Sequence, residues 1–325
     1  MKKIRAGVVG VGHLGRFHAE KYSVLEEAEL VGVVDLSSER AADVALKTNS
    51  KAYGDYSDLF GLVDAVTIAT PTESHLMVGL DFLSRGVDCL IEKPIAMNPA
   101  EADRLVKEAE RTGAVLQVGH LERFNPAVTA LEGRVVDPIF IEADRLSPFP
   151  GRSVDIDVIL DLMIHDIDII MNLVRADVVD VKAMGIPVIT DTVDVANARL
   201  RFSNGCVANV TASRVSEESV RKTRLFQRDS FITIDYARQH ISITRAEHDG
   251  AGGIKKMVAE ELDIVKGDAL LEEVRSFLKS SASGAAPLVS GSVGKKALDV
   301  AERVQRSVNA SMERFNAEMG SLSGA

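Results

Sequence analysis

The sequence predicts an α/β protein in which an N-terminal doubly wound parallel sheet is followed by an α+β domain with a mostly antiparallel sheet. The first third alternates short apolar runs with amphipathic helical segments, and a glycine-rich turn follows the first apolar run. From about residue 120, strand-like segments succeed one another with few helices between them. A length of 325 residues also favours two domains, because single cores seldom grow so large. We place the domains at residues 1–120 and 121–325, with the last helices able to pack back on the first domain.

The strands of the first domain are expected where apolar runs stand between helical patterns. They are Ile4–Val9, Leu30–Val34, Ala65–Ala69, Asp88–Ile91 and Ala114–Val118. A helix is expected at Pro99–Arg111, where apolar residues recur at helical spacing. Such alternation implies right-handed crossovers and a ligand crevice at the C-terminal ends of the strands.

The second domain is expected to begin with a short helix near Asn125–Leu131, a strand at Ile139–Arg145 and a helix at Ile156–Leu173. Further strands are expected at Val178–Met184, Val193–Phe202, Cys206–Ser213, Lys222–Gln227, Phe231–Asp235 and His240–Arg245. The turn Ser203-Asn204-Gly205 predicts a hairpin. Helices return at Leu270–Lys279 and Lys295–Arg314.

The glycine-rich turn has the G-x-G-x-x-G spacing of a dinucleotide site. Gly10 allows a sharp turn, Gly12 lets the backbone approach a pyrophosphate, and Gly15 lets the helix pack close to the sheet. The phosphates would lie at the helix N-terminus, whose N–H groups and dipole favour anions. Asp35 ends the second apolar run, 35 − 15 = 20 positions after Gly15, where a carboxylate holds the adenosine ribose. Because Asp35 repels a 2′-phosphate, NAD is favoured over NADP.

Polar residues follow two other predicted strands. Thr70, Pro71 and His75 come after Ala65–Ala69, and Glu92-Lys93-Pro94 follows Asp88–Ile91. Taken alone, Thr70 also fits a helix cap and His75 a surface histidine. Lys93 is harder to explain structurally, because burying an ammonium without purpose is costly. Pro94 restricts Lys93 to extended geometry, which directs its side chain toward the crevice.

The expected helix of the second domain carries Asp161 and His165 four positions apart, on one helical face, and Asp168 can extend that face. A solvated face is disfavoured by the apolar residues around the cluster. A metal site would need further His or Cys ligands at matching spacing, and none is evident. An Asp–His pair instead suits acid/base catalysis: His removes the proton of an alcohol, a carboxylate orients it, and an ammonium such as that of Lys93 stabilises the alkoxide.

Bulk properties exclude several classes of protein. A formal charge of −10 without a basic run argues against nucleic-acid binding. Cys89 and Cys206 are far apart and are expected to be free thiols in a reducing compartment. No signal-peptide core or membrane-spanning run is evident, so a cytoplasmic protein without a membrane partner is expected.

The chain resembles the glucose-fructose oxidoreductase / inositol dehydrogenase / MocA (Gfo/Idh/MocA) family over nearly its whole length. The resemblance is carried by the segment from Gly7 to His18, by Glu92-Lys93-Pro94 and by the Asp161…His165 pair. It implies an N-terminal Rossmann domain that binds NAD and a C-terminal domain whose large open sheet makes oligomer contacts.

The resemblance also implies roles for individual residues. Lys93 and His165 are the implied catalytic pair, and Asp161 assists them. The implied cofactor contacts, which combine the glycine motif with the polar strand ends, are Gly10, Gly12, His13, Leu14, Gly15, Asp35, Thr70, Pro71, His75, Glu92 and Lys93.

The segments Val118–Pro126 and Asp144–Arg152 resemble the corresponding segments of one subgroup of the family. Enzymes of that subgroup oxidise the 3-hydroxyl of UDP-N-acetylglucosamine to a ketone, which is later aminated for lipid A. The implied substrate contacts are Lys93, Arg123, Asn125, Arg145, Arg152, Asp161 and His165. Arginine forks suit a diphosphate, although each arginine also fits a salt bridge. A free polyol or another sugar as substrate, and an NAD-binding sensor without turnover, stay open as alternatives. A homodimer or homotetramer is expected, because the open sheet needs a cover.

Overall fold

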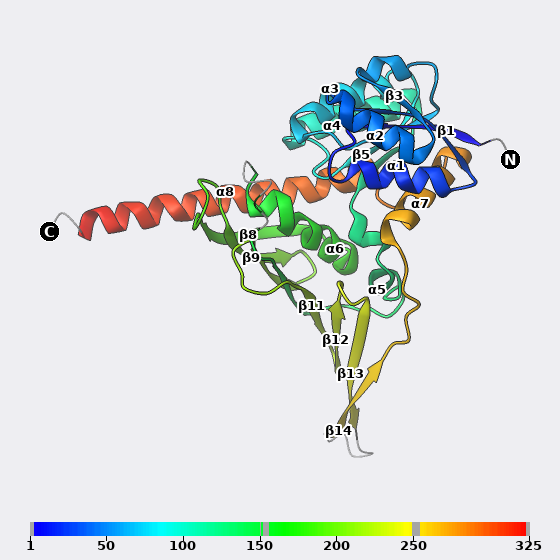
Figure 1. The fold of residues 1–325 in the computed structure, drawn as a ribbon. Coiled ribbons are helices and arrows are strands. Elements are labelled where there is room, and N and C mark those ends of the chain that lie inside the picture. The colour runs from blue at the N-terminus through cyan, green and yellow to red at the C-terminus, as the bar shows by residue number, and fades with distance from the viewer. Residues whose placement is uncertain (1–2, 150, 152–155, 249–253, 323–325) are drawn as a thin grey trace. The chain divides into compact units, whose positions relative to one another are not determined.

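The computed structural model describes residues 3–149, 151, 156–248 and 254–322, which form two compact units (Figure 1). Unit 1 comprises the chain up to Phe124 together with Asp268–Leu298, and unit 2 comprises Asn125–Gly267 together with the chain from Asp299 onward. The predicted boundary after residue 120 differs from this division, because residues 121–124 and Asp268–Leu298 belong to unit 1. Contacts such as the Lys21–Asp268 ion pair at 2.7 Å and the hydrogen bond from Ser281 Oγ to Asp88 tie the returning segment to it.

Unit 1 is built on a parallel sheet, as predicted, but the sheet has six strands where the sequence predicted five. Its strands are β1 (Ile4–Val9), β2 (Ala28–Val34), β3 (Lys51–Tyr53), β4 (Ala65–Ile68), β5 (Asp88–Glu92) and β6 (Leu116–Gly119). Their order is β3-β2-β1-β4-β5-β6, so the winding direction reverses between β1 and β4. Ligands bind outside the carboxyl ends of strands at such a switch point.

Helices cover both faces of this sheet. They are α1 (Gly15–Val24), α2 (Ser38–Thr48), α3 (Thr72–Leu83), α4 (Pro99–Thr112) and α7 (Ala269–Ser283), with two 3₁₀ turns, η1 (Tyr56–Leu59) and η2 (Leu121–Phe124). Helix α1 packs against α2 and α7, whereas α3 packs against α4. Local chemistry fixes the helix ends: Asn98 caps α4 by accepting a hydrogen bond from the Glu101 N–H, and Gly113 ends it in the left-handed conformation.

Unit 2 contains an eight-stranded sheet in the order β14-β13-β12-β11-β7-β10-β9-β8, in which only the β7–β10 pair is parallel among the described strands. The strands are β7 (Phe140–Leu146), β8 (Val178–Ile186), β9 (Val195–Phe202), β10 (Val207–Ser213), β11 (Val220–Gln227), β12 (Ser230–Asp235), β13 (His240–His248) and β14 (Ile254–Glu261). The predicted hairpin joins β9 to β10, with Gly205 at a φ of +90°. β14 was not predicted: from Lys256 to Glu261 it is exposed or half-buried, so it carries no apolar pattern.

Alternation along the strands gives this sheet one buried face. In β9, Ala196, Ala198 and Leu200 are buried, whereas the residues between them are exposed. The helical segments of unit 2 are α5 (Pro126–Thr129), a π-helical turn η3 (Ile159–Met163), α6 (Ile164–Val174) and the C-terminal part of α8 (Gly291–Leu322). α6 packs on β7 and β10. Ser307 of α8 bonds the backbone of Ala183 in β8.

Among the described residues, no helix has both the length and the apolar character that a membrane span requires. The longest, α8, has 32 residues and is amphipathic.

Candidate functional site

The glycine motif forms a tight turn between β1 and α1. Gly10 has a φ of +83°, and a Cβ there would lie 2.8 Å from the carbonyl oxygen of Ala69 and the amide nitrogen of Thr70. A Cβ on Gly15 would lie 1.8 Å from the carbonyl oxygen of Gly10. Both positions therefore require glycine, because any side chain would collide with backbone.

Gly12 faces open space, and this is where the motif fits a dinucleotide. The nearest atom to a Cβ at Gly12 would be Arg40 Nη1, at 3.8 Å. Leu14 precedes α1 without a side-chain cap, and the positive end of the helix dipole favours an anion at this turn. His13 and Leu14 are exposed on the same turn, with His13 edge-on to Phe17. These features fit the pyrophosphate of NAD.

Asp35, at the end of β2, is only 8% exposed and ties the glycine turn to the sheet. One of its oxygens accepts a hydrogen bond from the Val11 N–H at 3.0 Å, and the other accepts one from the Ser37 N–H at 2.9 Å. Arg40 lies 3.4 Å from the carboxylate. The carboxylate thus stands beside the turn, where an adenosine ribose is expected, and its contact with the ribose stays a prediction.

His75 joins two loops at the strand ends. It is 1% exposed, so the alternative of a surface histidine is wrong. Its Nδ1 lies 3.0 Å from the carbonyl oxygen of Pro94 and its Nε2 lies 2.9 Å from that of Thr70. Burial lowers the pKa of His75, and the bonds to backbone carbonyls oppose this only in part. Pro71 stands at the start of α3, and the Thr70 hydroxyl accepts a hydrogen bond from Ser74.

Lys93 is held from both sides through its neighbours. Its N–H donates to Glu92 Oε2 at 3.1 Å, and Glu92 Oε1 lies 2.8 Å from Nε2 of the buried His18 on α1. The following Lys93–Pro94 peptide bond is cis, and Pro94 is in turn contacted by His75. His18 is a residue that the sequence reasoning missed. It ends the glycine-rich segment, and only the fold brings it beside Glu92, 74 residues away.

The Asp161–His165 pair lies at the junction of η3 and α6, with both side chains half-buried. The sequence predicted a continuous helix from Ile156, whereas the structure has a π-helical turn here, a feature often found at functional sites. Asp157 caps this turn by accepting hydrogen bonds from the N–H groups of Ile159 and Leu160, both at 3.0 Å. Asp168, unlike the pair, is buried.

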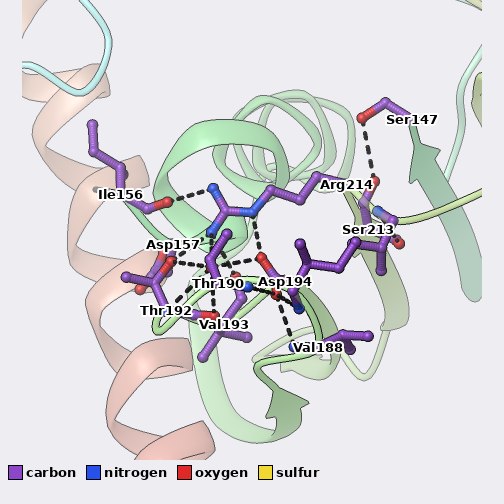
Figure 2. Close-up of polar contacts among 12 residues, drawn as sticks. Ser147, Ile156, Asp157, Val188, Thr190, Thr192, Val193, Asp194, Ser213 and Arg214 are labelled. Atoms are coloured by element: carbon purple, nitrogen blue, oxygen red, sulfur yellow. Dashed lines mark hydrogen bonds and ion pairs between the residues drawn. The ribbon is translucent and has the colours of Figure 1, made fainter. Parts of the chain in front are cut away.

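A buried network around Arg214 anchors the chain just before this turn (Figure 2). Arg214 Nη1 donates to the carbonyl oxygen of Ile156 at 2.8 Å, and its Nε donates to Asp194 at 2.8 Å. Asp194 also accepts three backbone N–H bonds, at 2.7–2.8 Å, from residues 188–190. Burial would raise the pKa of Asp194, but these hydrogen bonds outweigh it and lower that pKa. The network therefore holds the loop between β8 and β9 and the entry to the π turn.

The predicted substrate-binding residues are placed as follows. Arg145 is 4% exposed and forms a two-pronged ion pair with Asp166 of α6, at 2.7 and 3.1 Å, so a salt bridge is present at this position. Asn125 caps α5 through the Ala127 N–H and donates to the carbonyl oxygen of Tyr236. Arg123 lies buried in η2. Arg152 lies outside the described residues. A role in binding a sugar nucleotide stays a prediction for all four, and contact with its diphosphate stays a prediction for the three arginines.

Fold and site together define a two-domain nicotinamide-dependent oxidoreductase. Residues 4–120 match the oxidoreductase family with an NAD-binding Rossmann fold, and residues 133–228 match the GFO/IDH/MocA C-terminal domain. The chain belongs to the Gfo/Idh/MocA family of NAD-binding oxidoreductases.

Individual relatives agree with this assignment. The chain is 42% identical to a UDP-N-acetylglucosamine 3-dehydrogenase from Acidithiobacillus ferrooxidans, over 97% of this chain and 100% of the relative. The solved structure of that enzyme superposes with a TM-score of 0.90 at 41% identity, covering 95% of this chain and 99% of the other. A myo-inositol 2-dehydrogenase from Thermotoga maritima is 28% identical over 91% of this chain and 93% of its own.

Proposed function

We propose that this chain oxidises the 3-hydroxyl group of UDP-N-acetylglucosamine to a ketone, with NAD as oxidant. The observation that carries the proposal is the 42% identity, spread over 97% of this chain, to a relative named for that reaction. The identity to the myo-inositol enzyme is 28%. Both Lys93 and His165 are present, which favours turnover over a sensor role.

When bound, NAD takes up the hydride that leaves the substrate carbon. We assign removal of the hydroxyl proton to His165, because imidazole titrates near neutral pH. Asp161 lies one helical turn before it and would orient the ring and stabilise its charged form. Lys93 would stabilise the developing alkoxide with its ammonium group. Its backbone is held by Glu92 and, through Pro94, by His75, which supports a fixed position for that charge.

For the diphosphate of the substrate we propose arginine forks, which bond oxyanions in pairs. Arg123, Arg145 and Arg152 are the candidates for this role. Arg145 already makes a two-pronged contact with Asp166, and this supports a role in fixing α6 to β7 beside the Asp161–His165 pair. Asn125 supports the site by holding α5 against the end of β12.

The test is the absorbance of reduced nicotinamide when the protein and NAD are mixed with UDP-N-acetylglucosamine. Free N-acetylglucosamine and myo-inositol serve as parallel substrates. We expect a rise with the UDP-sugar alone. A rise with a free sugar or polyol would replace the proposed substrate. NAD binding without turnover of any of the three would favour the sensor alternative.

The cellular setting is also a proposal. A 3-keto product is the substrate that an aminotransferase needs, so we place the reaction before an amination in the synthesis of a lipid A amino sugar. Cys89 and Cys206 are buried free thiols, and burial raises the pKa of both, which suits a reducing cytoplasm.

A further inference from the structure

Three ionisable side chains lie together in the interior of unit 1. His18 of α1, Glu92 of β5 and Glu273 of α7 each place one polar atom within 4.8 Å of the others. Glu273 was not singled out from the sequence, yet it is 0% exposed. Neither of its carboxyl oxygens has a hydrogen-bond partner among the residues that the structure describes. A buried carboxyl group without a partner requires a physical explanation.

The neighbouring charge of Glu92 bears on the protonation state of Glu273. An ionised Glu273 would place a second negative charge beside Glu92 in surroundings that exclude water. Burial first, and then the charge of Glu92, raise the pKa of Glu273 well above its usual range. Burial acts the same way on Glu92, but the hydrogen bond and charge of His18, together with Lys93, outweigh it and lower the pKa of Glu92. These opposite shifts favour an ionised Glu92 beside a neutral Glu273.

The groups around Glu273 are consistent with a neutral Glu273 beside an ionised Glu92. His18 and Tyr22 face the cluster from α1, Glu92 from β5, and Gln117 of β6 donates to the backbone carbonyl oxygen of Glu273 at 3.3 Å. The Tyr22 hydroxyl lies 2.9 Å from Thr67 Oγ1. Since His18 Nε2 already contacts Glu92 Oε1 at 2.8 Å, a metal ion between these two atoms would have to break that hydrogen bond.

The cluster reaches Lys93 through Glu92. Glu92 Oε2 accepts the Lys93 N–H at 3.1 Å. Gly119 of β6 leaves room for this carboxylate, because a Cβ there would lie 3.0 Å from Oε2. Whatever fixes the Glu92 carboxylate therefore fixes the backbone of Lys93.

We propose that Glu273 is a positioning residue for Lys93: as a neutral carboxylic acid it donates a hydrogen bond through one buried water to Glu92, and so holds the carboxylate that anchors the Lys93 backbone. The effect on turnover rests on the catalytic role proposed for Lys93. The protonation of Glu273 does not.

The first test is infrared spectroscopy of the whole protein without substrate. The difference spectrum between wild type and Glu273→Gln at neutral pH is expected to contain the carbonyl band of a protonated carboxylic acid, which shifts in heavy water. Glu272→Gln, an exposed neighbour on the same helix, is the matched control and is expected to leave that band in place. Absence of the band in wild type overturns the proposal, whether the cluster then holds a metal ion or two carboxylates.

The second test compares kcat and KM of two variants, using whichever of UDP-N-acetylglucosamine, N-acetylglucosamine and myo-inositol is turned over. Glu273→Gln keeps a donor, so its kcat is expected within about threefold of wild type. Glu273→Met has none, and its kcat is expected to fall about tenfold with KM little changed. Equal rates in Glu273→Met and wild type, or equal losses in both variants, overturn the positioning role. If Glu273→Met does not fold, the kcat of Glu273→Gln and the infrared band of the wild type still test the proposal. An acid band in a protein that turns over none of the three would contradict the proposed function alone.

Discussion

At the scale of single residues, buried polar side chains hold the strand ends of unit 1 in place. His18 contacts Glu92, His75 contacts the carbonyl oxygens of Thr70 and Pro94, and Asp35 holds Val11. Each of these groups joins segments that are distant in sequence. Lys93, with backbone contacts on both sides, is thereby presented on a rigid support, which suits the catalytic role proposed for its ammonium group.

Replacing either proposed catalytic residue is expected to abolish most turnover. Lys93→Ala and His165→Ala remove the alkoxide-stabilising charge and the base, so kcat is expected to fall by a factor on the order of hundreds or more. NAD binding of His165→Ala, measured by calorimetry, and the circular dichroism spectra of both variants are expected to stay unchanged. Wild-type rates in both variants would contradict the assignment.

Asp35 is predicted to set the preference between the two nicotinamide cofactors. Asp35→Ala is expected to weaken NAD and to relax the rejection of NADP, because the carboxylate no longer bonds the ribose or repels a 2′-phosphate. Asp35→Asn keeps an acceptor for the Val11 N–H but removes the negative charge. It therefore distinguishes the effect of the charge on cofactor choice from the effect of losing the hydrogen bond that supports the turn. Dissociation constants for both cofactors are the measurement. An unchanged ratio in both variants would place Asp35 away from the ribose.

The buried His75 makes folding stability depend on pH. Its pKa in the folded chain is below the ordinary value of 6.5, so the unfolded chain binds the proton at a higher pH. The free energy of unfolding is thus expected to decline as pH falls below 6.5 toward the folded-state pKa. Urea unfolding at about pH 7.5 and about pH 5.5 is expected to show a smaller decline in His75→Gln than in wild type. Equal declines would show that His75 does not contribute.

At the scale of elements, most strands and helices follow from sequence patterns, and the exceptions have physical reasons. The exposed edge strand β14 carries no apolar alternation, and the three-residue β3 is too short to show one. The π-helical turn at Ile159–Met163 depends on side chains from elsewhere. Asp157 is bonded by Gln305 of α8 at 2.7 Å, and Ile156 is bonded by Arg214. No local pattern around residues 156–163 contains that information.

Breaking the Arg214 network is expected to be strongly destabilising. Arg214→Met leaves Asp194 charged and buried without its cation, so the free energy of unfolding is expected to drop by about 3–5 kcal/mol. The control is Arg224→Met, which breaks the more exposed pair with Glu142, where about 0–1 kcal/mol is expected. Urea denaturation of both variants is the measurement, and similar small losses in the two would contradict the role of the network.

At the scale of the whole molecule, the sheet of unit 2 has an outer face that carries apolar side chains. Three half-buried phenylalanines, Phe140, Phe226 and Phe231, form a row on it with ring centroids 5.8–5.9 Å apart. The residues next to them along the strands, Ile141, Leu225 and Ile232, point into the core. An aromatic row on this face, together with the exposed Met184 and Ile186 of β8, favours the predicted self-association.

Light scattering coupled to gel filtration tests this proposal. A mass of two or four times 35.0 kDa is expected for the wild type. Phe226→Asp is expected to reduce that mass toward a single chain, because it places a charge in the aromatic row. Leu46→Asp, at an exposed position on α2, is the control and is expected to leave the mass unchanged. A wild-type mass of a single chain would contradict self-association.

The sequence by itself determined the doubly wound sheet, the mostly antiparallel second sheet and the NAD-binding turn, because strand alternation and glycine spacing are local patterns. It also singled out Lys93 and the Asp161–His165 pair by residue type. Only the tertiary structure brought His18 and Glu273 to Glu92 and paired Arg145 with Asp166. These contacts join positions far apart in the chain. Whether a buried carboxyl group is stable in its charged form depends on the partner that the fold places beside it, and no local sequence pattern specifies that partner.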